Sequence, residues 1–347
     1  MQALTAPPCL LEWGMTSEAG PGPDEFETIA RLLRPLAHAP EALGLTDDAA
    51  AIPSRLDQDL IVSKDAMVAG VHFLQDDPLD MVARKLLRTN LSDLAAKAAE
   101  PYGYFLAVAW PASAGWAERE RFAAGLAEDQ ARFGLSLLGG DTVSTPGPLT
   151  LSMTILGWTP SGAMVRRSAG RPGDRVLVSG TIGDGWLGLQ AARGELAGII
   201  PPEAAEWLAG RYRLPEPRLE LRGALRARAG GAADVSDGLI ADAGHIATAS
   251  GVRLRLDLER LPVSEPASRW LELQPDRAAA LLALATGGDD YEVVLTVRPD
   301  DADPLIAEAE ASGVALTDIG EAVDGEELWV RFEGRDLALG RTGWRHG

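Results

Sequence analysis

Aspartates recur along this chain directly after short apolar runs, at the points where candidate strands end. This setting is shared by Asp65, Asp141, Asp234 and Asp237. A fifth, Asp93, lies within a helix predicted over 78–99. Asn90 and Lys97 share its face, because residues three or four apart are helical neighbours. Taken alone, Asp93 would be assigned to a solvated helix face. Converging carboxylates would repel one another unless divalent cations neutralised them, so the recurrence predicts multi-metal nucleotide chemistry.

Glycines adjoin several of these acidic positions. Residues 135–142 predict an apolar strand that ends in Gly139, Gly140 and Asp141. Glycine lets a backbone approach a ligand closely and exposes N–H groups to phosphate, and a neighbouring carboxylate can hold magnesium. Gly-Gly-Asp is also common turn material, so both interpretations stay open. The pattern lacks the Gly-Lys-Ser/Thr of a Walker A loop and the spacing of a Rossmann glycine motif.

A second site of the same kind is predicted at 234–239, where Asp234 and Asp237 bracket Ser236 just before a predicted helix. The free N–H groups at the start of a helix would face an incoming anion. Ordinary N-capping by Ser236 or Asp237 explains one of these residues but not both aspartates. The segment 287–292, Gly-Gly-Asp-Asp-Tyr-Glu, either serves the same purpose or is a turn.

The composition restricts the class of protein. The 347 residues include 51 Asp and Glu against 32 Lys and Arg, a formal net charge of -19. Such an acidic chain is not expected to bind nucleic acid or an anionic membrane surface. The only cysteine, Cys9, excludes disulfides and cysteine-based zinc sites, and fits a reducing cytoplasm. No run of about 18 apolar residues predicts a membrane span.

Apolar periodicity predicts a mixed fold, α/β or α+β, in two domains. A proline-rich tail over 1–23 is expected to be disordered, with Met15 as an alternative start. Glycine and proline crowd together at 159–173, so we expect an N-terminal domain over 24–158 and a C-terminal domain over 159–347. Strands are predicted at 49–52, 60–63, 104–110, 149–158, 175–179, 252–258, 291–297, 316–319 and 327–332. Helices are predicted from Asp24 and at 78–99, 115–133, 183–193, 203–209, 216–229, 240–250 and 301–312.

Six motifs, in this order, resemble the thiamine-monophosphate kinase family of the aminoimidazole ribonucleotide synthetase superfamily. The motifs are LTDDAA at 45–50, SKDAMVAGVHF at 63–73, NLSDLAA at 90–96, LGGDT at 138–142, DVSDGL at 234–239 and GGDDYE at 287–292. The resemblance covers about 24–346. It implies a homodimer whose N-terminal sheets pair into a shared barrel, with ATP in the adjoining cleft. The apolar faces of the predicted strands at 104–110 and 149–158 also favour a homodimer. The implied reaction converts ATP and thiamine phosphate into ADP and thiamine diphosphate.

The resemblance implies roles for individual residues. Magnesium ligands correspond to Asp48, Ser63, Asp65, Asp93, Asp141, Asp234 and Asp237. ATP contacts correspond to Gly140, Asp141, Arg167 and Ser236, and substrate contacts to His72, Asp289 and Trp344. No dedicated catalytic base is expected, because a phosphate oxygen is already anionic; Asp93, Asp141 and Arg167 support the transfer. Thr46, Lys64 and Asp289 depart from the Gly, Thr and Glu that are common in the family.

Two other classes of function stay open. One is a sister enzyme of the superfamily, such as a ribonucleotide cyclo-ligase or an enzyme acting on selenide, although Cys9 lacks the context that a selenide enzyme needs. The other is a non-catalytic protein that binds thiamine phosphate or a nucleotide; the complete set of acidic residues argues against it. Among single residues, His72 also suits a packing or capping role, and Trp344 a place in the core.

Overall fold

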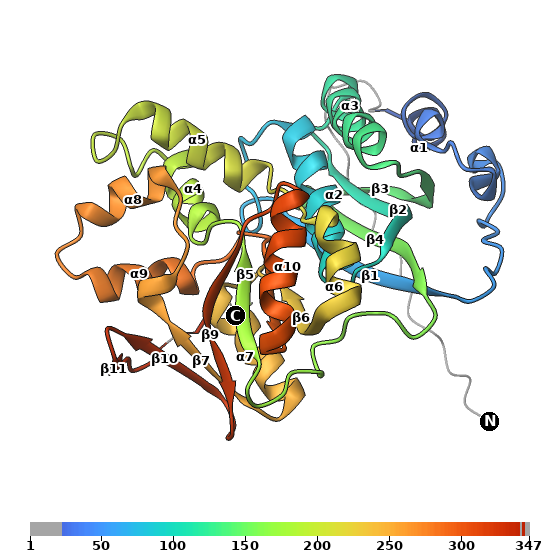
Figure 1. Cartoon of the computed structure of the whole chain (residues 1–347). Helices are drawn as coiled ribbons and strands as arrows, with labels where there is room; N and C mark the ends of the chain where they lie inside the picture. Colours follow the sequence, from blue (N-terminus) through green and yellow to red (C-terminus); the bar gives the residue numbers. More distant parts are fainter. Residues whose placement is uncertain (1–22, 341, 344–347) are drawn as a thin grey trace, which may run out of the picture.

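The computed structural model describes residues 23–340 and 342–343. Nearly all of the predicted tail, including Met15, and the predicted substrate contact Trp344 lie outside these residues. The described chain forms two mixed sheets, of four and seven strands, each with its own helices (Figure 1). The predicted α/β class is confirmed. None of the helices in this part of the chain is long and apolar enough to cross a membrane.

The N-terminal half is built on the four-stranded sheet, in the order β1-β4-β2-β3. Its elements are α1 (Glu25–Thr28), a π-helical turn η1 (Ile29–Leu33), the 3-10 turns η2 (Arg34–Leu36) and η3 (Pro40–Leu45), β1 (Gln58–Val68), α2 (Leu79–Ala96), β2 (Glu100–Pro111), α3 (Trp116–Phe133), β3 (Leu137–Thr145) and β4 (Thr150–Pro160). The long helices α2 and α3 cover one face of this sheet (Figure 1). They correspond to the helices predicted at 78–99 and 115–133.

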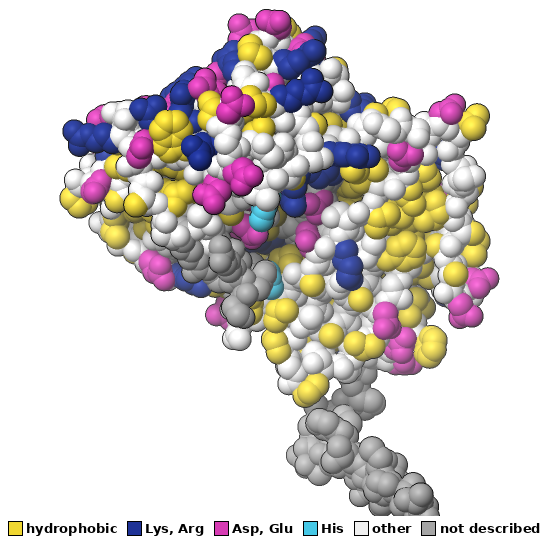
Figure 2. Space-filling model, turned by 90° about the horizontal axis from the view of Figure 1, so that it is seen from below, with side chains coloured by type: hydrophobic (Ala, Val, Ile, Leu, Met, Phe, Trp, Pro, Cys, Tyr) yellow, Lys and Arg dark blue, Asp and Glu magenta, His cyan; other side chains and the backbone are white. Residues whose placement is uncertain are grey.

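Alternation along the strands gives this sheet a buried and an open face. Residues such as Met153 of β4 point inward and pack against buried leucines of α2 such as Leu86. Their chain neighbours point to the opposite face, where Leu60, Val62 and Val143 are 37%, 56% and 50% exposed. Figure 2 shows hydrophobic side chains gathered on the underside of the molecule. One chain therefore leaves apolar side chains of this sheet in water.

Three predictions for this half were wrong. No strand forms at 49–52, because these residues lie between the Asp47-Asp48 turn and Pro53 without a partner strand. The strand predicted at 60–63 is longer, since β1 continues through Asp65. Likewise, β3 does not end at its glycines and Asp141 but continues to Thr145, so Asp141 lies inside a strand. Periodicity could not indicate this, because glycines contribute no side chain to the alternation that predicts a strand.

The C-terminal half is built on the seven-stranded sheet, in the order β11-β10-β7-β9-β5-β8-β6. Its elements are β5 (Arg175–Ser179), α4 (Asp184–Ala192), α5 (Pro202–Arg213), η4 (Leu219–Leu221), α6 (Arg222–Arg228), β6 (Ala229–Asp234), α7 (Leu239–Ser250), β7 (Arg253–Asp257), η5 (Leu258–Arg260), α8 (Glu265–Glu272), α9 (Arg277–Thr286), β8 (Val293–Val297), α10 (Pro299–Ala311), β9 (Leu316–Val323), β10 (Leu328–Phe332) and β11 (Arg335–Asp336). Helices α6 and α10 pack on one face through Leu225 and Leu305, and α7 packs on the other through Ile246 (Figure 1). Ala96 of α2 joins the first of these layers and so connects the two halves.

Most elements predicted for this half are confirmed, with ends shifted by a few residues. The exception is the single helix predicted over 216–229. That segment holds only the short turn η4 and α6, and its last residue already belongs to β6. Pro215 and Pro217 lie just before η4, and proline lacks the N–H group that a helix interior requires. Helices α8 and α9 were not predicted.

Candidate active site

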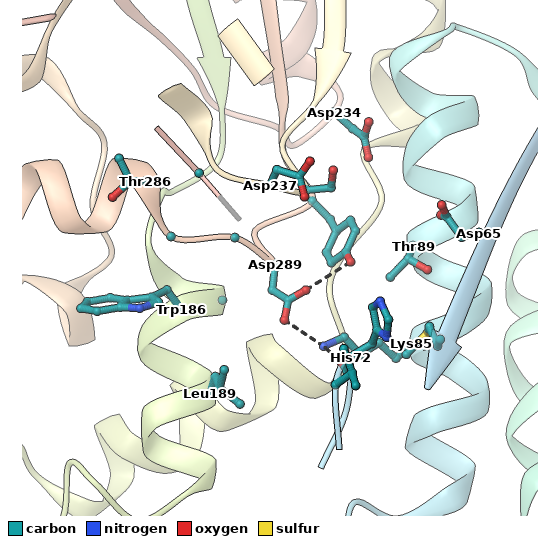
Figure 3. Close-up of a pocket in the computed structure, with 18 of the residues that line it drawn as sticks. Asp65, His72, Lys85, Thr89, Trp186, Leu189, Asp234, Asp237, Thr286 and Asp289 are labelled. Carbon is teal, nitrogen blue, oxygen red and sulfur yellow. Dashed lines mark hydrogen bonds and ion pairs between the residues drawn. The ribbon is translucent and has the colours of Figure 1, made fainter. Parts of the chain in front are cut away.

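A cleft with a cavity of about 540 Å³ runs between the two halves of the protein. One wall comes from β1, the turn after it and α2. The other comes from α4 and from the segments that follow β6 and α9 (Figure 3). Acidic side chains gather at one end, whereas Trp186 and Leu189 supply apolar surface at the other. The cleft thus offers a bound molecule two chemically different ends.

Four of the predicted magnesium ligands line this cleft together: Asp65 from β1, Asp93 from α2, Asp234 at the end of β6, and Asp237 in the loop after it. Burial, then the nearby charges of Asp93 and Asp237, raise the pKa of Asp65 from 3.8 to about 6. Burial, then the charges of Asp93 and Asp242, raise the pKa of Asp234 well above its ordinary value. Buried carboxylates at such close range favour a bound cation or retained protons.

Hydroxyl and cationic groups surround Asp93. Ser63 Oγ donates a hydrogen bond of 2.6 Å to Asp93 Oδ2. Burial raises the pKa of Asp93, while this hydrogen bond and the charges of Lys97 and Arg167 act to lower it. Lys97 Nζ donates to the carbonyl of Ala232 over 2.7 Å, and burial, then Arg167, lower its pKa to about 8. Arg167, a predicted ATP contact, therefore lies near enough to the acidic cluster to offset part of its charge.

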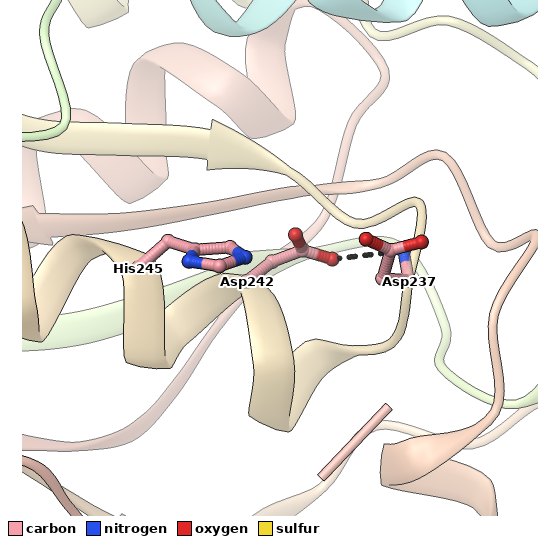
Figure 4. Close-up of side chains that lie close together, drawn as sticks. All are labelled: Asp237, Asp242 and His245. Carbon is pink, nitrogen blue, oxygen red and sulfur yellow. Dashed lines mark hydrogen bonds between the residues drawn. The ribbon is translucent and has the colours of Figure 1, made fainter. Parts of the chain in front are cut away.

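Two N–H groups of the loop between β6 and α7 are bound by a carboxylate of α7. The N–H groups of Ser236 and Asp237 both donate to Asp242 Oδ2, each over 3.1 Å. Figure 4 shows the bond from Asp237. Burial, then the charge of Asp237, raise the pKa of Asp242 to about 7. His245 follows on the same helix, and ligand atoms of Asp237, Asp242 and His245 lie within 4.8 Å of one another. A side chain of α7 therefore satisfies two N–H groups that precede the helix, and the prediction that the N–H groups of its first turn face an anion stays a prediction.

His72 and Asp289, two of the predicted substrate contacts, lie near each other in the cleft (Figure 3). The N–H group of Val68 donates to His72 Nδ1 over 3.0 Å, which places the proton of the neutral imidazole on Nε2. Asp289 accepts from Lys85 Nζ over 3.1 Å on Oδ2 and from the hydroxyl of Tyr291 over 3.2 Å on Oδ1. The carboxylate of Asp289 is therefore already anchored on both oxygens.

Lys85 and Trp186 line the cleft and were not predicted. Lys85, Thr89 and Asp93 follow one another at four-residue intervals on α2, a spacing that places them on one helix face and could have indicated Lys85. Trp186 is the third residue of α4, and its ring packs edge-to-face on Trp270 with 5.7 Å between centroids. No spacing in the sequence distinguishes Trp186 from an ordinary core tryptophan.

Asp48, Gly140 and Asp141 line a second cavity, of about 360 Å³. Gly140 has a φ of +154°, and a Cβ at this position would lie 1.8 Å from the carbonyl oxygen of Leu106. Only glycine fits there, because any side chain would collide with the neighbouring strand.

The two cavities divide the predicted magnesium ligands. β4 and β2 separate β1 from β3, so the strands that carry Asp65 and Asp141 lie three strand spacings apart, about 14 Å measured across the sheet. The two side chains also point to opposite faces of the sheet. Asp65 lies opposite the inward-pointing Met153, whereas Asp141 lies opposite Ala107 on the open face. A single chain therefore does not bring these two carboxylates together.

Two of the departures from the family pattern lie outside the acidic cluster. The ammonium of Lys64 donates to Ser152 Oγ over 2.6 Å on the open face of the sheet, so this side chain points away from the cleft. The hydroxyl of Thr46 donates to the carbonyl three residues earlier, within its own turn. Gly343 lines the cleft, and Trp344 after it lies outside the described residues.

Comparison with known proteins extends over nearly the whole chain. The family of AIR synthase related proteins matches with its N-terminal domain over residues 46–159 and with its C-terminal domain over 171–332. A thiamine-monophosphate kinase of Caulobacter vibrioides is 58% identical over 326 residues, which cover 94% of this chain and 91% of that protein.

Solved structures agree with these relatives. The crystal structure of thiamine-monophosphate kinase from Stenotrophomonas maltophilia K279a matches with a TM-score of 0.77 and 37% identity, over 88% of this chain and 94% of that one. The structure of AaThiL complexed with AMPPCP and TMP matches with a TM-score of 0.74 and 27% identity, over 87% of this chain and 91% of that one.

Proposed function

Because the chain belongs to the AIR synthase related family and, within it, to the thiamine-monophosphate kinases, we propose that it phosphorylates thiamine phosphate with ATP. The products are ADP and thiamine diphosphate. The enzyme is a phosphotransferase whose acceptor is itself a phosphate group. The relative solved with AMPPCP and TMP binds an ATP analogue together with this substrate.

One observation carries the proposal: a single cleft joins the acidic cluster to an end with aromatic and hydrogen-bonding side chains. Thiamine phosphate has the matching polarity, with a phosphate at one end and a cationic thiazolium and a flat aminopyrimidine at the other. The phosphate then lies toward Asp65 and Asp93, and the rings lie toward His72, Asp289 and Trp186. An aromatic face attracts a cationic ring by about 0.5–2 kcal/mol.

Magnesium is the cofactor that we propose for the acidic cluster. Ser63, Asp65, Asp93, Asp234 and Asp237 offer oxygen donors alone, which are the ligands that Mg²⁺ prefers. The raised pKa values of Asp65 and Asp234, caused by burial and then by the neighbouring carboxylates, fit this assignment, because a divalent cation would stabilise the ionised form of both. Bound Mg²⁺ supplies charge neutralisation and orientation of the phosphates. Asp48 and Asp141 are proposed as further ligands, from the second cavity.

The side chains of the protein then hold and orient the two reactants. The attacking atom is a phosphate oxygen that is already anionic, so no residue has to remove a proton from it. Arg167 lies near Asp93 and is placed to offset negative charge on the transferred group. We assign ATP contacts to Arg167, Ser236, Gly140 and Asp141, and substrate contacts to His72, Asp289 and Trp344.

We further propose a homodimer that pairs the open faces of two four-stranded sheets. Leu60, Val62 and Val143 are exposed on this face, and a second chain would remove them from water. Asp141 lies on the same face, so the second cavity would adjoin the subunit interface. The cytoplasm, where ATP is available, is the location that we propose.

A turnover assay with ATP and Mg²⁺ tests the function, with thiamine phosphate, free thiamine and an aminoimidazole ribonucleotide precursor compared side by side. Of the three acceptors, we expect only thiamine phosphate to react rapidly, giving ADP and thiamine diphosphate. Free thiamine should be a poor acceptor, because it lacks the anionic oxygen that replaces a general base. Equal rates with thiamine and thiamine phosphate would contradict this mechanism. Turnover of the aminoimidazole precursor would favour the sister activity, and binding of thiamine phosphate without ADP formation would favour a binding protein.

A further inference from the structure

Lys85 is a buried cation in the cleft that no step of the proposed phosphoryl transfer uses. It lies on α2, is 2% exposed and lines the cavity. Its ammonium donates to Asp289 Oδ2 over 3.1 Å and to the carbonyl of His72 over 3.3 Å. The same ammonium lies 3.7 Å from the centroid of the Tyr212 ring. One side chain therefore connects α2 with the turn after β1, the segment before β8, and α5.

Asp289 is held firmly for a residue that is expected to meet a substrate. Its φ is +69°, in the left-handed region that Asp adopts more readily than most residues. Its N–H group donates to the carbonyl of Ser236 over 2.9 Å. Lys85 occupies one carboxylate oxygen, and the hydroxyl of Tyr291 occupies the other. Because a carboxylate accepts about four hydrogen bonds, two acceptor positions remain, and the side chain is 29% exposed in the cleft.

Electrostatics make Lys85 and Asp289 depend on each other. Burial lowers the pKa of Lys85, and the charge of Asp289, followed by that of Asp77, acts in the opposite direction. Asp77 already accepts a hydrogen bond of 2.7 Å from Arg213 Nε. Asp289 is therefore the carboxylate in direct contact with the ammonium of Lys85. Removal of one partner from such a buried pair leaves the other uncompensated.

We propose that Lys85 is a positioning residue that holds the Asp289 carboxylate with its remaining acceptor positions toward the rings of thiamine phosphate. The inference rests on the proposed function, and it concerns a residue outside the predicted ligand and contact set. Lys85 also anchors the backbone of His72, the other substrate contact on this side of the cleft. Loss of the ammonium should weaken binding of thiamine phosphate and leave ATP binding unchanged.

A double-mutant cycle on the full chain tests this coupling. The variants are Lys85→Met, which removes the ammonium and keeps an unbranched apolar side chain, Asp289→Asn, and the two combined. We expect each single change to raise KM for thiamine phosphate about tenfold, an effect within the range typical of contacting residues. The combined variant should also show about a tenfold rise, not about a hundredfold rise, because Lys85 acts through Asp289. KM for ATP should stay within about twofold of the parent.

Arg213→Met is the matched control, because it removes a different cation that pairs with a carboxylate next to α2. It should leave KM for thiamine phosphate unchanged. Circular dichroism checks the fold of each variant, and Lys85→Gln replaces Lys85→Met in the cycle if the latter does not fold. Additive effects in the cycle, an equal rise in KM for both substrates, or an unchanged KM in the Lys85 variant would overturn the assignment.

Calorimetric titration of thiamine phosphate with a non-hydrolysable ATP analogue and Mg²⁺ separates this inference from the proposed function. A parent chain that binds thiamine phosphate and turns it over, with additive variants, overturns the role of Lys85 alone. If the parent chain neither binds thiamine phosphate nor turns it over, the proposed function and the role of Lys85 are both overturned.

Discussion

Replacing Asp65 with asparagine should stabilise the metal-free protein near neutral pH and abolish its activity. Folding raises the pKa of Asp65 from 3.8 to about 6, through burial and then the charges of Asp93 and Asp237. The folded protein therefore holds this proton more tightly than the unfolded chain does. Ionised Asp65 therefore destabilises the folded protein. This destabilisation is absent below the pKa that Asp65 has in the unfolded chain, grows as the pH rises, and is complete above the pKa that it has in the folded protein. The difference in pKa corresponds to about 3 kcal/mol of unfolding free energy at neutral pH.

Urea unfolding in the presence of a chelator measures this effect for the parent and for Asp65→Asn. At about pH 8 the variant should be more stable by up to about 3 kcal/mol, and at about pH 4.5 by about 1 kcal/mol, a third of that amount. Magnesium should stabilise the parent more than the variant, because the variant has lost a ligand. Asp76→Asn removes an exposed carboxylate from the turn after β1 and should show no gain. The reasoning would be refuted if Asp65→Asn were no more stable than the parent at about pH 8, or if its gain in stability were the same at both pH values.

Three further predictions test the rest of the site. Asp93→Asn and Asp141→Asn should each lower turnover about a hundredfold or more, measured at low magnesium, with a melting temperature near that of the parent; full activity would exclude the residue as a ligand. Val62→Lys should convert the proposed homodimer into a monomer by light scattering, because it places a charge on the exposed apolar face; a monomeric parent would contradict the proposed assembly. Trp344→Ala should raise KM for thiamine phosphate and leave that for ATP nearly unchanged; an unchanged KM would remove Trp344 from the substrate contacts.

Sequence reasoning was most successful where local pattern and local structure coincide. The helix that carries Asp93 follows from its apolar spacing and lies within three residues of the prediction at either end. The strand through Gly139 and Gly140 was predicted to end too early, because glycine has no side chain that could contribute to the alternation of apolar and polar residues. Sequence reasoning did not indicate that Asp242, which lies five and six residues further along the chain, accepts hydrogen bonds from the N–H groups of Asp237 and Ser236. A capping box relates residues only three positions apart, so it could not indicate Asp242 as the acceptor.

The amino-acid sequence by itself determined the class of chemistry. Oxygen-donor aspartates beside glycines, an acidic overall charge and the absence of a usable cysteine all depend on residue types, and these belong to the chain before it folds. Tertiary structure alone decided which of those aspartates meet. Asp65 and Asp141 belong to one sheet, yet strand order and the two-residue alternation of side chains place them in different cavities. Tertiary structure also brought Lys85 to Asp289, which lies 204 residues further along the chain. Such a contact arises from the packing of one half against the other, and no local spacing encodes it.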